Sequence, residues 1–230
     1  IGQFARLTCF LENHLIGDPT FRFTPNVDAG FDINQALVLK EGDVAFWKKQ
    51  LHSPLADMQA LALRKLSDAD YKDIVPLLEE SYYHSDSFMV RLEALRLMVL
   101  NHPAKSVKII QSALNDSYEL IRRYAGEYAE KNGSPSLIPA WVNAYLQRSQ
   151  EKRLRFKVIN GVDAFPYADI KAEIEKQAAS MILYNREHVD AILAQLPRQE
   201  ASMERDIETI TNPKSKASYV RRDLRTFRNH

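Results

Sequence analysis

Histidine and cysteine are the side chains of this sequence whose types could bind a metal or act as nucleophile and base. The chain has six histidines and one cysteine, and no two histidines are three or four residues apart. Zinc sites of the usual kind need closely spaced His and Cys ligands, so we expect no metal site. Cys9 and His14 are five residues apart, which does not place them on one face of a helix. A buried free thiol is the favoured interpretation of Cys9.

The signatures of common catalytic and cofactor-binding sites are also missing from the sequence. It contains no G-x-S-x-G motif, no phosphate-binding glycine loop and no dinucleotide fingerprint. Glu79 and Glu80 are adjacent, so on a helix they point in different directions, which argues against a paired acid and base. We therefore predict no cofactor and no catalytic activity in this chain itself.

Clusters of arginine and tyrosine indicate a different kind of site, one that contacts a partner. Arg and Tyr dominate the hot spots of protein interfaces. The candidate contact residues are Tyr118, Arg122, Arg123, Tyr145, Arg148 and Arg153. These residues form two clusters, one around Tyr118, Arg122 and Arg123 and a basic one around Tyr145, Arg148 and Arg153. A structural interpretation is favoured for both. In the first cluster, Tyr124 and Tyr128 belong to the core and Arg122 pairs with an acidic group of a neighbouring unit, while the second cluster is a solvated face.

His84 lies between Tyr82-Tyr83 and Asp86 in an expected turn. One interpretation is a proton donor beside aromatic binding groups. The favoured interpretation is a turn histidine that is bonded to a backbone group.

Composition describes an ordinary globular chain. Of 230 residues, 45% are hydrophobic and 27% are charged. The 31 basic and 30 acidic residues give a net charge of +1, without the whole-chain positive field that nucleic-acid binders usually show. No apolar run is long enough to span a membrane, so we expect no membrane span.

A pattern that recurs every 31 or 32 residues organises the chain from Asp57 to Val158. Ala62 aligns with Ala94 at a step of 32 residues, and Ala94 aligns with Ala125 at a step of 31. Recurrence at about 20 to 50 residues is typical of helical arrays. Between the copies, Asn101-His102-Pro103 and Asn132-Gly133-Ser134-Pro135 are helix stop and start signals. Each unit is therefore predicted to be helix, short turn, helix.

Residues 90–98 read V-R-L-E-A-L-R-L-M, which resembles the core V-R-x-x-A-L-R-x-L of HEAT-like repeats of the short bacterial type. This resemblance implies an all-α fold, a right-handed α-solenoid of HEAT-like helix pairs. We expect a non-repeat N-terminal segment over 1–30, a connector and capping helix over 31–52, the repeats over 53–175, and C-terminal capping helices with a basic tail over 176–230.

Local signals refine the third repeat and the C-terminal region. Asp116 followed by Glu119 is predicted to form a capping box. Three closing helices are expected: one over 167–183, a second that ends before Pro197, and a last one that contains Met203. The tail beyond Pro213 is basic, and its apolar residues have helical spacing compatible with docking: Tyr219, Val220, Leu224 and Phe227.

Residues 13–22 read N-H-L-I-G-D-P-T-F-R, which is similar to the closing string N-L-x-G-D-P-T/S-x-R of gingipain-type (C25-like) cysteine peptidase domains. This resemblance implies that the chain is the tail of a larger secreted hydrolase, with its catalytic residues upstream. The start at Ile1, without Met, also indicates a processed or excised piece. The alternative is a helix, turn and strand that cap the repeats.

Three functions follow as hypotheses. The leading one is a non-catalytic helical-repeat scaffold that binds another protein or an upstream domain of the same polypeptide. The second is a C-terminal accessory region of a secreted C25-like peptidase. The third is a HEAT-like DNA glycosylase, which resembles this chain in length and helical repetition but needs a basic concave face, whereas the charges here are nearly balanced. A secreted or periplasmic location is favoured over a cytoplasmic one.

Overall fold

The computed structural model describes residues 30–146, 158, 161–181 and 183–212. Over these residues the chain is all-α and has no strand, which confirms the predicted fold class at that level. None of the helices in this described part is both long and apolar enough to cross a membrane.

The chain divides into two units, Ile1–Glu41 and Gly42–His230. The described part of the first unit holds one short helix, α2 (Ile33–Leu39). The carboxylate of Asp32 accepts the backbone N–H of Gln35 at 3.1 Å, which satisfies one of the free donors at the start of this helix.

The second unit is built from α-helices that are joined by short 3-10 turns. Its α-helices in the described part are α3 (Val44–Gln50), α4 (Ala56–Asp68), α5 (Ile74–His84), α6 (Phe88–Asn101), α7 (Val107–Ala113), α8 (Glu119–Asn132), α9 (Ile138–Leu146), α11 (Tyr167–Ala178) and α12 (Leu183–Thr211). Its 3-10 turns are η1 (Pro103–Lys105), η2 (Pro135–Leu137) and η3 (Gly161–Ala164).

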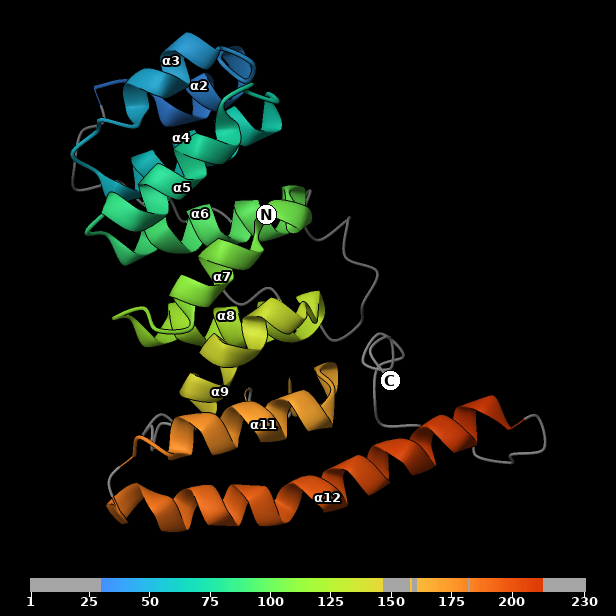
Figure 1. Cartoon of the computed structure of the whole chain (residues 1–230). Helices are drawn as coiled ribbons and strands as arrows, with labels where there is room; N and C mark the ends of the chain where they lie inside the picture. Colours follow the sequence, from blue (N-terminus) through green and yellow to red (C-terminus); the bar gives the residue numbers. More distant parts are fainter. Residues whose placement is uncertain (1–29, 147–157, 159–160, 182, 213–230) are drawn as a thin grey trace, which may run out of the picture. The chain divides into compact units, whose positions relative to one another are not determined.

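Helices of the second unit pack on helices that are close to them in sequence (Figure 1). α6 contacts α4 before it and α8 after it, and it also packs on α5. α7 packs on α8, α9 on α11, and α11 on α12. Along the chain, the predicted order of helix, short turn, helix is found at α4–α5, α6–α7 and α8–α9.

Alanines 62, 94 and 125 are each completely buried, one in each of α4, α6 and α8. A side chain that ends at Cβ lets two helix backbones approach closely, and these three helices contact each other in order. The equivalent positions predicted by the 31- to 32-residue period thus have equivalent burial. The core also contains larger side chains that are fully buried, among them Trp47 and Trp141.

The predicted helix ends are confirmed where glycine or proline specifies them. α8 ends at Asn132, and Gly133 follows with φ of 63°, a left-handed conformation that glycine adopts without strain. α6 ends at Asn101, and Pro103 begins η1. The predicted capping box is wrong, because α8 begins at Glu119 and the Asp116 carboxylate instead accepts the N–H of Tyr118 at 2.8 Å.

The prediction that a helix ends before Pro197 is also wrong. α12 is a single helix of 29 residues with Pro197 inside it. Proline removes one helical hydrogen bond, at a cost of about 3 kcal/mol in a helix interior. The buried residues on either side of it form one row at helical spacing: Val189, Ile192, Leu196 and Met203. Burial of this continuous row favours one helix over two.

Candidate functional site

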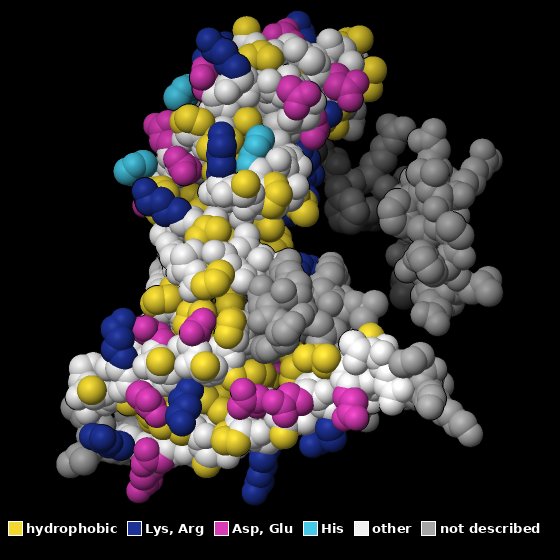
Figure 2. Space-filling view, turned by 45° about the vertical axis from the view of Figure 1, so that its right-hand side comes forward, with side chains coloured by type: hydrophobic (Ala, Val, Ile, Leu, Met, Phe, Trp, Pro, Cys, Tyr) yellow, Lys and Arg dark blue, Asp and Glu magenta, His cyan; other side chains and the backbone are white. Residues whose placement is uncertain are grey.

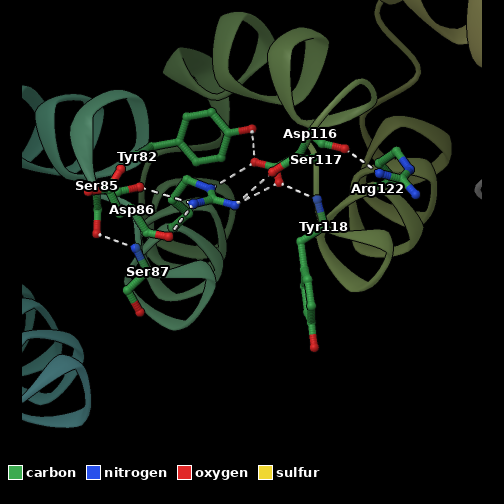
Figure 3. A network of polar contacts seen from close by, with 9 residues as sticks. Tyr82, Ser85, Asp86, Ser87, Asp116, Ser117, Tyr118 and Arg122 are labelled. Carbon is green, nitrogen blue, oxygen red and sulfur yellow. Dashed lines mark hydrogen bonds and ion pairs between the residues drawn. The ribbon is translucent and has the colours of Figure 1, made fainter.

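An ion pair between Arg91 of α6 and Asp116 joins two successive helix pairs (Figure 3). Arg91 donates from Nε to Asp116 Oδ2 and from Nη2 to Asp116 Oδ1, both at 3.0 Å. The side chains are only 13% and 6% exposed. A two-pronged contact of this kind, shielded from water, is the strong form of an arginine–carboxylate interaction.

Both partners of this pair have further hydrogen bonds. The hydroxyl of Tyr82 donates to Asp116 Oδ2 at 3.1 Å, and the N–H of Tyr118 donates to Oδ1. Arg91 Nη1 donates to the backbone carbonyls of Ser85 and Asp86, each at 3.0 Å. The network therefore holds the turn between α5 and α6 and ties it to the turn before α8.

The network shifts the pKa values of two of its side chains, Asp116 and Tyr82. Burial by itself would raise the pKa of Asp116, but the hydrogen bonds from Arg91 and from the Tyr118 N–H outweigh burial and hold this pKa below its usual value. Burial, with the nearby Asp116 charge, raises the pKa of Tyr82 far above its usual value. Asp116 is thus ionised and Tyr82 is a neutral donor at neutral pH.

Arg122 repeats one part of this geometry. It lies 31 residues after Arg91. Its Nη1 donates to the carbonyl of Asp116, six residues earlier, as Arg91 donates to the carbonyl of Ser85, six residues earlier (Figure 3). This carbonyl contact does not test the prediction that Arg122 pairs with an acidic group of a neighbouring unit, because residues 147–157 lie outside the described part of the chain.

A second buried carboxylate, Glu93, lies between two arginines 32 residues apart. Arg64 of α4 donates to it at 2.8 Å, and Arg96 donates to it at 2.7 and 3.0 Å. The Glu93 side chain is 9% exposed, whereas Arg64 is 50% exposed. Burial would raise the pKa of Glu93, but the bonds from Arg96 and Arg64 reverse this and lower it. Glu93 therefore joins α4 to α6 as a charged group.

Beside the Arg91 network lies a groove of about 760 Å³. It is formed by α3, α4, α5 and the first turn of α6, with the connecting loops between them. Its apolar lining residues are Leu51, Pro54, Ala56, Leu63, Pro76, Leu77 and Val90. A volume of this size lies within the range of about 300 to 1,000 Å³ that is usual for ligand-binding pockets.

The charged side chains of the groove are mostly acidic. Glu80 and Asp86 are exposed, and their carboxylates take part in no ion pair with any described residue. Asp73 accepts a hydrogen bond from the Tyr71 hydroxyl at 3.2 Å. The only lysine of the lining, Lys48, lies over the Tyr71 ring, 5.3 Å from its centroid. The groove lining thus combines apolar side chains, called its floor below, with the exposed carboxylates of Glu80 and Asp86, called its edge.

No protein-family model matches the chain, and no curated protein matches it. Within the described ranges, no three His, Cys, Asp or Glu side chains are grouped so that they could hold a metal ion.

Four of the six predicted contact residues, Tyr118, Arg122, Arg123 and Tyr145, lie in the described part of the chain. Tyr118 is 40% exposed and stacks on Phe88, with ring centroids 4.1 Å apart. Arg122 and Arg123 lie near the start of α8, and both are half-buried. Tyr145 is a correction: it is only 6% exposed and its ring packs on Trp141, so its side chain belongs to the core. Arg148 and Arg153 lie outside the described residues, as does the peptidase-like string 13–22.

Two further differences between prediction and structure concern Tyr124 and His84. Tyr124, predicted as core, is 38% exposed, because the buried row of α8 passes through Ile121, Ala125 and Tyr128 instead. His84, expected to bond to a backbone group, is the exposed last residue of α5 and lines the groove. The groove itself was not predicted, and its one sequence signal was the polar turn that includes Asp86.

Proposed function

We propose that this chain is a non-catalytic α-solenoid of HEAT-like helix pairs that binds a segment of another protein in the groove of α3 to α6. The repeat is supported by the matching contacts of Arg91 and Arg122 and by the matching burial of Ala62, Ala94 and Ala125. Repeat scaffolds bind partners along extended surfaces that successive units create together.

The observation that carries the binding role is the groove, with its apolar floor and free acidic edge. An apolar floor can bury side chains of a peptide, and the carboxylates of Glu80 and Asp86 can accept its basic groups. The chemistry of the lining therefore selects a partner segment that carries apolar residues next to Lys or Arg. Rim charges of this type mainly affect specificity and association rate.

On the face that Figure 2 shows, the described basic side chains are interspersed with acidic ones. Nucleic-acid binding relies on basic groups that gather on one face and neutralise phosphates. This distribution favours a protein partner over the DNA glycosylase alternative.

A random-peptide display selection on the full chain tests the binding role. We expect enrichment of peptides with Lys or Arg beside apolar residues. Leu77→Lys, in the groove floor, should abolish the binding of enriched peptides. Leu100→Lys is the matched control, because Leu100 is 58% exposed and does not line the groove.

The result that would overturn the proposal is a lack of enrichment, or equal binding by both variants. Circular dichroism of each variant confirms that it is folded before binding is compared.

A further inference from the structure

We infer that the groove is occupied by the basic C-terminal segment of this chain itself, residues 213–230. This inference rests on the proposed function, since it takes the groove as a peptide site. The segment contains six of the 31 basic residues and one of the 30 acidic residues. It therefore carries a charge of +5, while the rest of the chain carries −4.

The groove supplies the opposite charge. Its lining holds three carboxylates, of Asp73, Glu80 and Asp86, against the single ammonium of Lys48. Lys48 lies over the Tyr71 ring, and among the described residues it forms no ion pair with Glu80 or Asp86. Opposite charges on the groove and on this segment, whether it comes from the same chain or from a second copy, favour their encounter.

The residue pattern of the segment also matches the two kinds of groove surface. Val220, Leu224 and Phe227 have the spacing of apolar anchors that a helix lays into a groove. An arginine follows each of them directly, at positions 221, 225 and 228. An apolar row with a basic row beside it fits an apolar floor with an acidic edge.

The experiment uses a fluorescein-labelled peptide of residues 213–230 and measures its fluorescence anisotropy on binding to the full chain. In one version of the chain, the tail arginines are neutralised by Arg221→Ser, Arg222→Ser, Arg225→Ser and Arg228→Ser. We expect the peptide to bind this version more tightly than the wild-type chain, whose own tail competes for the groove. Equal affinity for both chains would show that the tail does not occupy the groove.

Charge reversal locates the site. Glu80→Lys with Asp86→Lys, made in the tail-neutralised chain, should weaken peptide binding about tenfold or more. The matched control reverses two exposed carboxylates outside the groove, Glu175→Lys and Glu204→Lys, and should change binding less than about twofold. If both pairs weaken binding equally, the attraction is a general charge effect and the inference fails. If the first pair unfolds the chain, Leu77→Lys replaces it.

Sedimentation analysis separates the two sources of the segment once the anisotropy experiment has shown that the tail occupies the groove, because an undocked tail would also leave a monomer. Docking within one chain gives a monomer at all concentrations, and docking between copies gives a concentration-dependent dimer that Glu80→Lys with Asp86→Lys removes. If display peptides bind the groove but the tail peptide does not, this inference fails while the proposed peptide-binding function stands.

Discussion

Replacement of Asp116 by asparagine tests how much the Arg91 network contributes to stability. Asparagine keeps the shape of the side chain and one carbonyl oxygen that can accept the Tyr118 N–H. It removes the negative charge and replaces one carboxylate oxygen by an amide N–H₂ group. The donors that this oxygen served, Arg91 Nε and the Tyr82 hydroxyl, would then face another donor. The substitution therefore leaves a shielded guanidinium without its counter-charge.

The magnitude follows from the burial of the pair. Removal of one partner from a buried ion pair typically costs about 3 to 5 kcal/mol. Arg91 keeps the carbonyls of Ser85 and Asp86 and a 3.3 Å contact to Ser117 Oγ, so part of its hydrogen bonding survives. We therefore expect a loss of about 3 kcal/mol, a large fraction of the roughly 5 to 15 kcal/mol that stabilises a typical domain.

Urea unfolding followed by circular dichroism at pH 7 measures this loss. Asp86→Asn is the matched control, since it makes the same chemical change in the preceding turn. The Asp86 carboxylate is exposed and unpaired within the described chain, and its backbone carbonyl contact to Arg91 is retained. We expect this control to remain within about 0.5 kcal/mol of wild type.

The pH dependence separates charge from shape. The folded-state pKa of Asp116 is lower than its unfolded-state value, so the unfolded chain binds the proton more readily and stability rises with pH. The charge contribution of Asp116 is complete above its unfolded pKa of about 3.9 and is lost as pH falls through the lower folded value. The gap between wild type and Asp116→Asn should therefore narrow below about pH 4. A gap that is absent at pH 7, or one that stays constant into this acid range, would refute the reasoning.

Two further predictions concern packing and a helix end. Ala94→Leu should destabilise the chain by about 1 to 3 kcal/mol in urea unfolding, because Ala94 is fully buried where α6 meets its neighbours, whereas Ala191→Leu on the exposed side of α12 should cost little. Gly133→Ala should destabilise the chain by about 1 kcal/mol, because the φ of Gly133 is 63°. Gly42→Ala is the control and should cost less, since a Cβ added there meets no atom within 4 Å. Equal effects of the two glycine substitutions on the urea midpoint would contradict this explanation.

The sequence predicted helix ends well where one residue determines the backbone, and less well where packing determines it. Gly133 and Pro103 act through their own conformational limits, so local reasoning located the ends of α8 and α6. Pro197 is a helix breaker by local reasoning, yet the buried row of α12 continues on both sides of it. Tertiary burial outweighed a local preference there.

The polar networks were harder to predict because their members are distant in the sequence. The sequence analysis assigned no buried role to Glu93, which is buried and accepts hydrogen bonds from both Arg64 and Arg96. The 32-residue recurrence of arginine was visible, but nothing in the sequence specified that one glutamate would accept bonds from both. The groove was missed for the same reason, since its lining extends from Lys48 to Val90.

Two turns at equivalent positions of the repeat differ in where their acidic residue stands, and this difference explains why the Asp86 carboxylate is exposed at the groove. The turn after α5 reads Ser85-Asp86-Ser87, and the turn 31 residues later reads Asp116-Ser117-Tyr118. In the later turn the acidic residue stands one position earlier, where its carboxylate meets Arg91 and its carbonyl meets Arg122. In the earlier turn, Asp86 gives only its carbonyl to Arg91, and its carboxylate stays exposed at the groove. A shift of one residue thus converts a carboxylate that joins helix pairs into one that can meet a partner.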